Sequence, residues 1–444
     1  MKKFLLLFLA AVCVTALYGK NPKYVFLFIG DGMATPQRMV AEEFSRASGR
    51  GKLTINTLPS HATTRTGSAS SLVTDSAAAA TAIACGEKTN NGRIGMDSSG
   101  KRKLESVAYV ARKKGKKVGI VTSVTINHAT PAGFYAARPS RSQYYQIGLD
   151  LIASGFDYFG GGGVAKHDDK KSPEYKGNIY QLAADAGYKV VSTRKELAAL
   201  KPSVGKVLAR GAAGSLPYSI EKRTDVPTLA EFTAKGIELL DNPKGFFMMV
   251  EGGAIDWAGH ANEAAANLHE VLAFDDAVRV AAAFAAKHPE ETLIIVTGDH
   301  ETGGMTMGFA GTGYAMYVDR LLHQKCSVNT FAQKVKNERK KGAFSWEKAQ
   351  EMLTADFGFK FSGDIKKDPM VLTAREIKSL EKAFKENKLP AAARIVMSGK
   401  AGIGWTSGSH TALPVLTTSS GPGSEKFTGL IENTDIAKIL KTLL

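Results

Sequence analysis

Short apolar runs along the chain are each followed by a polar turn, a pattern typical of buried strands. Four of these runs cover Tyr24 to Ile29, Val118 to Thr122, Phe246 to Val250 and Leu293 to Thr297, and helical stretches such as Ala264 to Lys287 lie between them. Strands of this length interleaved with helices predict an α/β fold with a largely parallel central sheet. Such a fold binds its ligands at the carboxyl ends of the strands.

The pattern changes in the last third of the chain. From Thr302 to about Lys400 the sequence is rich in lysine and helical in pattern, and Thr373 to Glu376 forms a predicted capping box. We interpret residues 302–401 as a mainly helical insertion that divides a catalytic α/β domain into a first part, residues 20–301, and a final part, residues 402–444.

Three smaller features complete the predicted organisation. A strand is predicted at Leu413 to Thr417, and a closing helix near Thr434 to Leu443. The glycines from Gly160 to Gly163 are predicted to form a flexible loop, because no P-loop lysine follows them in register.

The N-terminus has the composition of an export signal. Met1-Lys2-Lys3 is followed by an apolar run from Phe4 to Val14 and by small residues, which predicts a signal peptide over residues 1–19 and a periplasmic or secreted protein. A membrane anchor needs about 20 apolar residues, so no transmembrane anchor is expected after processing. Val12 is bulkier than the small residue usual before a lipidated cysteine, which makes a lipoprotein at Cys13 the weaker alternative.

Charge and cysteine content exclude few classes of function. The formal net charge is +16, from 58 basic and 42 acidic residues, which favours anionic substrates by long-range attraction. The basic residues are dispersed and no aromatic-interleaved nucleic-acid motif accompanies them, so no specific nucleic-acid partner is expected. After the predicted signal peptide only Cys85 and Cys326 remain, and their spacing leaves open whether they pair.

Acidic residues follow three of the predicted strands. Gly30-Asp31-Gly32 follows the first strand, Glu251-Gly252-Gly253 the third, and Gly298-Asp299-His300 the fourth. Glycine beside each carboxylate lets the backbone turn sharply and approach a ligand closely. Because strand ends are where an α/β enzyme binds its ligands, these side chains predict a common site.

Four further residues could join that site. Asp256 and His260 are four residues apart, so on a helical turn they share a face and offer the oxygen and nitrogen ligands that zinc takes, although such a pair alone is more often a surface ion pair. His410 is by itself an ordinary loop histidine. Ser76 follows Asp75 and precedes an alanine-rich helix, so it stands at a helix start, either as part of a plain cap or as a nucleophile where an anion binds.

These motifs, taken in order, resemble those of the alkaline phosphatase family. The segments that carry the resemblance are Gly30-Asp31-Gly32-Met33, Thr74-Asp75-Ser76-Ala77-Ala78, His128-Ala129-Thr130-Pro131-Ala132, Val250-Glu251-Gly252, Asp256 to His260, Asp299-His300 and His410. The match runs from about Lys23 to Glu301 and again from Gly402 onward. It implies an alkaline-phosphatase-like three-layer sandwich with helices on both faces of the sheet, hydrolysis of small phosphate monoesters, and a homodimer.

The resemblance also implies roles for single residues. Ser76 would be phosphorylated during turnover, and each subunit would bind two zinc ions and one magnesium ion. The first zinc would be bound by Asp256, His260 and His410, the second by Asp31, Asp299 and His300, and the magnesium by Asp31, Thr130 and Glu251. An all-oxygen set of this kind suits a hard cation such as magnesium.

Four residues near these ligands need separate mention. Arg141 occupies the family position of a guanidinium that would clamp the phosphate oxygens, for which its planar fork is suited, and Arg138 is the alternative if the intervening loop is shorter. His128 stands where some members have aspartate, and Trp257 where others have lysine or histidine. Because residues two apart in an extended segment face the same side, we expect His128 to lie near the magnesium ligand Thr130.

Two other functions stay open from the sequence. A phosphodiesterase or a metal-dependent mutase of the same superfamily would use similar ligands, whereas a sulfatase is disfavoured because no Cys-x-Pro-x-Arg signature is present. A non-catalytic exported protein that binds phosphate or polyanions would explain the charge, but not a helix-start serine together with two zinc-ligand sets. A comparison of a monoester with a diester substrate separates the enzymatic alternatives.

Overall fold

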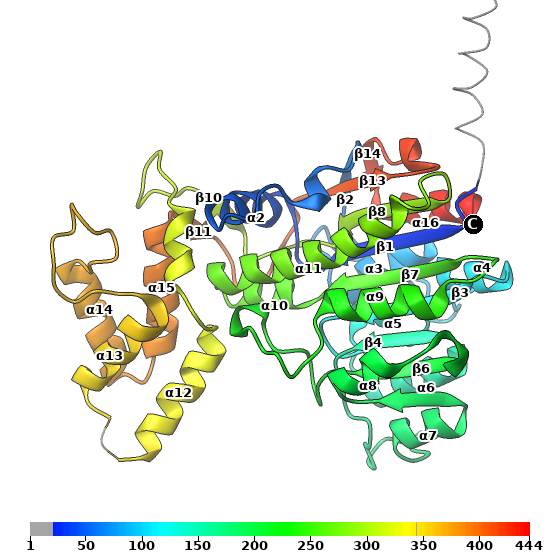
Figure 1. The fold of residues 1–444 in the computed structure, drawn as a ribbon, viewed down its shortest axis with the longest axis horizontal. Coiled ribbons are helices and arrows are strands. Elements are labelled where there is room, and N and C mark those ends of the chain that lie inside the picture. The colour runs from blue at the N-terminus through cyan, green and yellow to red at the C-terminus, as the bar shows by residue number, and fades with distance from the viewer. Residues whose placement is uncertain (1–20, 343) are drawn as a thin grey trace, which may run out of the picture.

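A ten-stranded sheet forms the centre of the structure, a computed structural model that describes residues 21–342 and 344–444 (Figure 1). Its strands lie in the order β14 (Gly429–Glu432), β2 (Ser60–Arg65), β13 (Val415–Ser420), β8 (Thr292–Gly298), β1 (Tyr24–Gly30), β7 (Phe246–Gly252), β3 (Lys117–Thr122), β4 (Tyr158–Gly161), β6 (Lys206–Arg210) and β5 (Tyr188–Val191). Within this sheet β13 is antiparallel to β2 and β8, and the other pairs are parallel. The predicted α/β fold is confirmed, while the predicted signal peptide lies outside the described residues.

Helices cover both faces of the sheet. One face carries α2 (Thr35–Ala47), α8 (Arg194–Ala199), α9 (Leu229–Leu240), α10 (Ala254–His260) and α11 (Ala264–Ala285). The other carries α3 (Ser76–Cys85), α4 (Val107–Lys113), α5 (Ala129–Ala132), α6 (Tyr144–Ser154), α7 (Ile179–Asp185) and α16 (Asn433–Leu443). Alternate strand residues point to opposite faces, so Phe26 and Phe28 of β1 join the first core and Leu27 and Ile29 the second.

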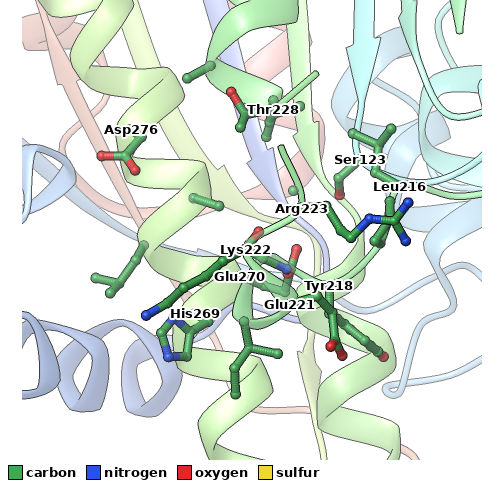
Figure 2. Close-up of a pocket in the computed structure, with 18 of the residues that line it drawn as sticks. Ser123, Leu216, Tyr218, Glu221, Lys222, Arg223, Thr228, His269, Glu270 and Asp276 are labelled. Carbon is green, nitrogen blue, oxygen red and sulfur yellow. The ribbon is translucent and has the colours of Figure 1, made fainter. Parts of the chain in front are cut away.

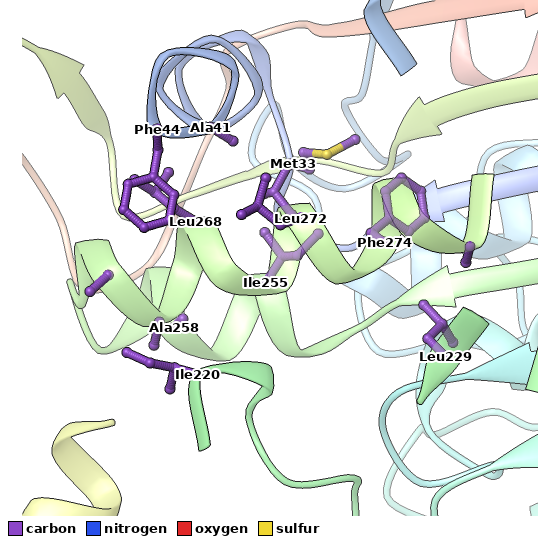
Figure 3. Packing of buried hydrophobic residues seen from close by; sticks show 14 of the residues in the cluster. Met33, Ala41, Phe44, Ile220, Leu229, Ile255, Ala258, Leu268, Leu272 and Phe274 are labelled. Carbon is purple, nitrogen blue, oxygen red and sulfur yellow. The ribbon is translucent and has the colours of Figure 1, made fainter. Parts of the chain in front are cut away.

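The core on the first face fixes the helix that follows β7. Figure 3 shows Phe44 of α2 and Leu268 and Leu272 of α11 packed near Ile255 of α10. Each fully buried side chain of this size stabilises the fold by roughly 1.5–3 kcal/mol. α10 is therefore held rigidly against α11, with its polar face directed away from this core.

The predicted insertion contains four helices and extends from one end of the molecule (Figure 1). They are α12 (Val328–Lys340), α13 (Trp346–Phe357), α14 (Ala374–Lys385) and α15 (Leu389–Ala401). The predicted capping box at the start of α14 is confirmed, because Glu376 N donates to Thr373 Oγ1 at 3.2 Å and Thr373 N donates to Glu376 Oε2 at 2.8 Å. Apolar residues of these helices are continuous with the core beside α11. The domain limits at 302 and 401 stay a prediction.

Short strands and 3₁₀ turns complete the described chain. Two antiparallel pairs flank the predicted insertion, β9 (Glu301–Thr302) with β12 (His410–Thr411) and β10 (Met305–Met307) with β11 (Ile403–Trp405). The 3₁₀ helices are Thr54–Asn56, Pro202–Val204, Ser219–Glu221, Val318–His323 and Ser424–Lys426.

Two local predictions were wrong. The loop predicted from Gly160 to Gly163 begins only at Gly162, because Gly160 and Gly161 belong to β4. A Cβ on Gly161 would lie 2.1 Å from the Thr122 carbonyl oxygen. Close packing of the sheet therefore requires glycine there. The strand predicted at Leu413 to Thr417 begins two residues later, at Val415, because Pro414 has no N–H to donate to a ladder.

The cysteine question is settled for the described residues. Cys85 and Cys326 are both free and buried, and burial raises the pKa of each thiol to about 12. Among the described residues, no helix combines the length and the apolar character needed to cross a membrane.

Candidate active site

The register of the three central strands brings the predicted acidic residues to one edge of the sheet. Gly30 of β1 is aligned with Gly252 of β7 and with Gly298 of β8. Asp31 and Asp299, each one residue beyond its strand, therefore become neighbours although they are far apart in the chain, and both side chains are fully buried. The prediction that acidic groups meet at the carboxyl edge of the sheet is confirmed.

Gly32 allows this edge to close against α10. Its φ is +71°, a left-handed conformation, and a Cβ at this position would lie 2.8 Å from Asp256 Cα. Any larger residue would push α10 away from the strand ends. The glycine beside Asp31 thus has the close-approach role that the sequence indicated.

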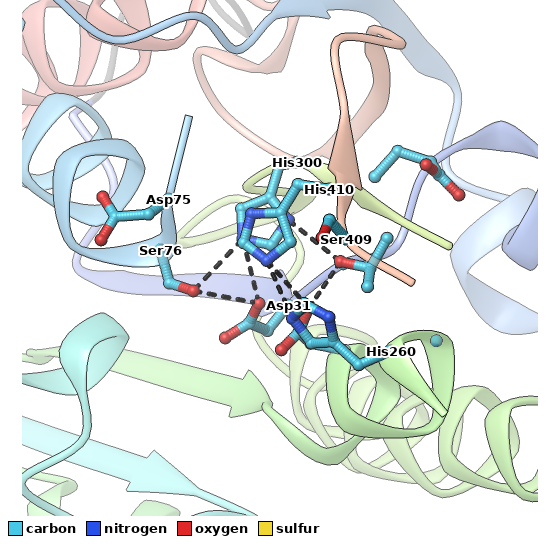
Figure 4. Close-up of polar contacts among 12 residues, drawn as sticks. Asp31, Asp75, Ser76, His260, His300, Ser409 and His410 are labelled. Atoms are coloured by element: carbon cyan, nitrogen blue, oxygen red, sulfur yellow. Dashed lines mark hydrogen bonds and ion pairs between the residues drawn. The ribbon is translucent and has the colours of Figure 1, made fainter. Parts of the chain in front are cut away.

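Three groups of side chains bring candidate ligand atoms within 4.8 Å of one another. The first group is Asp256, His260 and His410, the second group is Asp31, Asp299 and His300, and the third group is Asp31, His128 and Glu251. The first two groups are the two predicted zinc sets. Figure 4 shows four of their members, Asp31, His260, His300 and His410, around a common space with Ser76.

The second group is buried on every side. His300 Nε2 lies 3.3 Å from Asp31 Oδ1 and 3.3 Å from Asp299 Oδ2. Asp299 Oδ1 accepts hydrogen bonds from two backbone amides, but among the described residues its buried Oδ2 has no hydrogen-bond partner. Burial raises the pKa of Asp299 to about 7 and lowers that of His300, and burial with repulsion from Asp299 raises the pKa of Asp31. Two acids and a neutral imidazole facing one point fit a divalent cation.

The first group lies at the more open side of the site. The Nδ1 atoms of His260 and His410 each lie 2.8 Å from a backbone carbonyl oxygen, that of Gly408 and that of Thr74. Because a carbonyl only accepts, each Nδ1 carries a proton, and each ring is turned so that its Nε2 faces the group. The two Nε2 atoms are 3.1 Å apart, and each lies 3.4 Å from Asp256 Oδ1. Two nitrogen lone pairs and one carboxylate form a ligand set suited to zinc.

The acid in the first group differs electrostatically from those in the second. Burial works against ionisation of Asp256, but the hydrogen bond from His410 and the neighbouring histidine charges lower its pKa below the usual range. Burial also works against the charged form of His410, and the hydrogen bond and charge of Asp256 nevertheless raise its pKa. Asp256 is therefore ionised and ready to bind a cation across the neutral pH range.

The third group contains His128 beside the predicted magnesium ligands. Glu251 Oε2 accepts a hydrogen bond from Thr122 Oγ1 at 2.5 Å, and Thr130 Oγ1 donates to Asp31 Oδ2 at 3.3 Å. Glu251 Oε1 and His128 Nδ1 are buried without a partner among the described residues. Burial raises the pKa of Glu251 to about 8 and lowers that of His128 to about 4. These oxygens, with an unpaired imidazole nitrogen, fit a third cation.

The expected backbone geometry at His128 was wrong. His128 is the N-cap residue of α5 and Thr130 lies in the first turn of that helix, so the two are not on one side of an extended segment. His128 is nevertheless a member of the third group, and Thr130 contacts Asp31 of the same group.

Ser76 stands at the start of α3, as predicted. Asp75 is the N-cap residue and accepts a hydrogen bond from Ala78 N at 3.0 Å. Ser76 Oγ is buried and lies 3.2 Å from His300 Nε2 and 3.5 Å from Asp31 Oδ1. The hydroxyl therefore faces the second group, at a helix N-terminus that favours negative charge.

The two candidate arginines lie in different surroundings. Arg141 Nη1 donates to Asp75 Oδ2 at 2.9 Å and Nη2 lies 3.4 Å from His128 Nε2, which places its guanidinium at the edge of the site. Arg138 is paired with Asp150 at 2.8 Å and with Glu174 at 3.1 Å, away from the groups. Only Arg141 of the two contacts residues that adjoin Ser76.

Trp257 is partly exposed and packs against His128. Its side chain is 37% exposed, and its ring meets that of His128 edge-on, with 6.0 Å between ring centroids. Trp257 thus lies beside His128, a neighbour that the sequence did not indicate.

Four contacts of the site were not foreseen. Thr302 Oγ1 donates to Asp256 Oδ1 at 2.5 Å, and Thr122 Oγ1 holds Glu251. Asp75, expected only as a cap, also accepts from Gly92 N and pairs with Arg141. Thr122 is the last residue of a predicted strand, so the sequence could have placed it at the edge of the sheet with Glu251. The contact between Thr302 and Asp256 joins distant segments, so the sequence gives no sign of it.

A cavity of 710 Å³ lies beside the site (Figure 2). It is lined by residues of the 216–230 segment and of α11, including Tyr218, His269 and Glu270, and it reaches Ser123 and Gly252 next to β7. Its lining contains neither Ser76 nor any residue of the three groups. The predicted chemistry is therefore not located in this cavity.

Comparisons with known proteins agree with this geometry. The model of the alkaline phosphatase family matches residues 22–444. Alkaline phosphatases 3 and 4 of Bacillus subtilis are 34% and 35% identical to the chain, each over 94% of its length, and the matches cover 87% and 88% of those proteins. The crystal structure of a cold-active alkaline phosphatase from Shewanella sp. is 29% identical, with a TM-score of 0.83, over 95% of this chain and 99% of that one.

A second crystal structure supports the same fold. The alkaline phosphatase of Thermus thermophilus is 28% identical, with a TM-score of 0.82, over 96% of this chain and 92% of that chain. The three-layer architecture predicted for the chain is therefore confirmed. The chain belongs to the alkaline phosphatase family of metal-dependent phosphomonoester hydrolases.

Proposed function

We propose that this protein is an alkaline phosphatase that hydrolyses small phosphate monoesters through a phosphoserine intermediate at a site with two zinc ions and one magnesium ion. The observation that carries this proposal is the position of Ser76. Its hydroxyl stands at the N-terminus of α3 and 3.2 Å from His300 Nε2, within a site that also contains the first group. A serine in this position can be activated by a neighbouring metal ion and can accept a phosphoryl group.

The donor atoms support the metal assignment. In the proposal, the first and second groups each bind one zinc ion through a mixed nitrogen and oxygen set. Magnesium is bound by Asp31, Thr130 and Glu251, an all-oxygen set. The buried oxygens Asp299 Oδ2 and Glu251 Oε1 have no donor among the described residues, which is the arrangement expected where cations bind.

The residues then act in two displacements. Ser76 Oγ attacks the phosphorus, the bond to the ester oxygen breaks, and the alcohol leaves with a proton. Water then attacks the phosphoserine, its proton is lost, inorganic phosphate leaves and Ser76 regains its hydroxyl. When bound, the zinc ions supply Lewis acidity that lowers the pKa of the hydroxyl and of water and neutralises developing charge. Two in-line displacements retain the configuration at phosphorus.

Arg141 orients the phosphoryl group in this scheme. Its guanidinium is held by Asp75, the residue that precedes the nucleophile, at 2.9 Å. A planar fork fixed in this way can donate two hydrogen bonds to phosphate oxygens that do not react. Arg141 thereby favours a monoester, which has one more charged oxygen than a diester.

His128 tunes the third site in the proposal. A related alkaline phosphatase from the Antarctic bacterium TAB5, 26% identical over 96% of this chain, has been solved as histidine-to-glutamate and histidine-to-aspartate variants with magnesium bound in a metal site. Here the imidazole of His128 lies in the third group, where a nitrogen ligand suits zinc better than magnesium.

The test uses the purified mature protein with 4-nitrophenyl phosphate and with bis(4-nitrophenyl) phosphate. We expect rapid turnover of the monoester and slow turnover of the diester, loss of activity after chelation, recovery with zinc, and a further increase with magnesium. Acid quenching during turnover should trap a phosphorylated peptide that contains Ser76. Faster turnover of the diester would favour the phosphodiesterase, and phosphate binding without turnover after zinc reconstitution would favour the non-catalytic alternative.

The proposal extends to processing and assembly. Residues 1–19 act as a signal peptide, the mature protein reaches the periplasm or the exterior without a membrane anchor, and two copies form a homodimer. Residues 302–401 are an insertion in one catalytic domain. Mass spectrometry of the mature N-terminus tests the signal peptide, and light scattering of the purified protein tests the homodimer.

A further inference from the structure

The chain that directly follows α10 connects the first group to the predicted insertion. α10 carries Asp256 and His260 and ends at the C-cap residue Ala261. Ala261, Asn262 and Glu263, here called the junction, lead from α10 into α11. The His260 side chain is 40% exposed, so surrounding side chains do not fix its direction by packing alone.

Asn262 ties the end of α10 to the segment that precedes His410. Its φ is +49°, in the left-handed region, and its Nδ2 donates to Gly259 O at 3.0 Å and to Ser407 O at 2.8 Å. The carbonyl of the next residue, Gly408, accepts from His260 Nδ1 at 2.8 Å. One side chain therefore sets the distance between α10 and the backbone that orients the imidazole of His260.

The insertion holds the junction from its other side. Arg394 of α15 donates from Nη1 to the carbonyl oxygen of Ala261. The Glu263 carboxylate accepts from Gln324 Nε2 at 2.8 Å and from Val328 N, at the start of α12, at 2.6 Å. Glu263 is almost fully buried, so its loss of these donors would leave an unpaired acid in the core. Both ends of the junction are thus attached to the insertion.

We propose that the insertion is a structural part of the first zinc site, with Asn262 and Arg394 as positioning residues that direct His260 and His410 at one point. This inference rests on the zinc assignment in the proposed function. The two histidines come from separate segments, and their lone pairs converge only if α10 and residues 407–408 keep a fixed separation. Loss of a supporting contact of this kind lowers metal affinity by about 10–100-fold.

The experiment measures zinc bound to the mature protein at buffered free zinc concentrations, by equilibrium dialysis and elemental analysis. Asn262→Gly removes the side chain but tolerates the left-handed backbone, and Arg394→Gln removes the charge and the fork. Asn387→Gly is the control for the first, because Asn387 lies in the insertion with a φ of +60°. Arg339→Gln is the control for the second, because Arg339 Nη2 donates to Phe384 O at 2.9 Å within the insertion.

Each variant is also made in a His410→Ala background, in which only the second zinc site is expected to bind zinc tightly. In the otherwise wild-type protein, we expect Asn262→Gly and Arg394→Gln to lower the affinity for one of the two zinc ions by about 10–100-fold. In the His410→Ala background, we expect them to have no effect on zinc binding. The controls should stay within about twofold of the parent protein. Thermal unfolding checks that each variant folds, and if Arg394→Gln does not fold, Asn262→Gly decides.

Three results would overturn the inference. They are wild-type affinity of both sites in Asn262→Gly, an equal loss in the His410→Ala background, and an equal loss in the controls. A wild-type protein that binds fewer than two zinc ions gives a distinguishable result, since it refutes the zinc assignment itself and this inference with it.

Discussion

The first and second groups lie in one site but are held by different parts of the fold. The side chains of the second group have no exposed surface, and two of its members directly follow the aligned strands β1 and β8. In the first group, His260 is 40% and His410 13% exposed, and both come from segments outside the large sheet. The sheet holds one group, and loops with a helical insertion hold the other.

This difference separates two ways of building a binding site. In the second group, strand register alone brings the acids together, and their burial raises their pKa values until a cation compensates the charge. In the first group, backbone carbonyls orient the two imidazoles, and Asp256 is already ionised. We therefore expect the second group to control stability and the first group to exchange its metal more readily.

The largest expected effect concerns the hydroxyl that faces the second group. Ser76→Ala should lower turnover of a phosphate monoester by about a thousandfold or more, because the nucleophile is lost while the ligands are kept. Steady-state kinetics and zinc content measured on one preparation test this. Ser140→Ala, at a partly exposed serine next to Arg141, is the control and should leave turnover within about twofold. Near-normal turnover in Ser76→Ala would contradict the assignment of Ser76 as the nucleophile.

The next prediction separates the two groups directly. His410→Ala should lower the affinity for one zinc ion by more than about 100-fold and leave the affinity for the other unchanged. The loss should be this large because changes to residues that only support a ligand already lower metal affinity by about 10–100-fold. Asp299→Asn should instead weaken the zinc ion of the buried group. Zinc titrations of both variants check this. If His410→Ala retained both zinc ions at full affinity, the first group would not be a metal site.

Substitutions of Arg141 and Arg138 together test which arginine contacts the phosphate group. Arg141→Ala should weaken inhibition by inorganic phosphate by about 10–100-fold, the amount expected for losing charge-assisted hydrogen bonds. Arg138→Ala breaks the ion pairs with Asp150 and Glu174, so it should lower the melting temperature and leave phosphate affinity unchanged. The opposite result, with phosphate affinity lost only in Arg138→Ala, would exchange their roles.

His128 provides a smaller test at the third group. His128→Asp adds a carboxylate where an unpaired imidazole now lies, so magnesium should bind about tenfold more tightly to the zinc-loaded protein. Turnover should fall if phosphate is then held longer. Magnesium titrations of wild type and variant measure the change, and equal or weaker affinity in the variant would show that His128 does not tune the site.

The smallest expected effect is a pH dependence of the stability of the protein after its metal ions have been removed. In the folded protein the pKa is raised to about 7 for Asp299 and about 8 for Glu251, from ordinary values of 3.8 and 4.5. Between about pH 4 and 8 the unfolded chain ionises these acids while the folded state keeps their protons, so stability falls as pH rises and the loss is complete above pH 8. The melting temperature without metal should therefore be a few degrees lower at pH 9 than at pH 6.

Metal ions should reverse that trend. Protein reloaded with zinc and magnesium should gain more in melting temperature at pH 9 than at pH 6, because bound cations stabilise the ionised acids. Asp299→Asn removes one of the acids and should flatten the pH dependence of the stripped protein. A stripped protein whose stability rises between pH 6 and 9 would contradict the burial argument.

Local and periodic features could be predicted from the sequence. The four buried strands were placed within two residues of their observed ends, and Ser76 was expected at the helix start that Asp75 caps. The motifs were sufficient to name the residues that the first and second groups bring together. Apolar periodicity, capping chemistry and helical spacing depend on neighbours in the chain, so these signals survive without knowledge of the fold.

The tertiary structure alone decided which distant segments support these residues. Thr302 against Asp256, Asn262 against Ser407 and the tight fit of Gly161 against Thr122 join positions that carry no mutual signal in the sequence. The burial that makes His128 neutral and raises the pKa of Glu251 likewise depends on what packs around them. A single sequence records which side chains are available, but the distances and the desolvation that set their chemistry arise only when strand register and helix packing bring remote residues together.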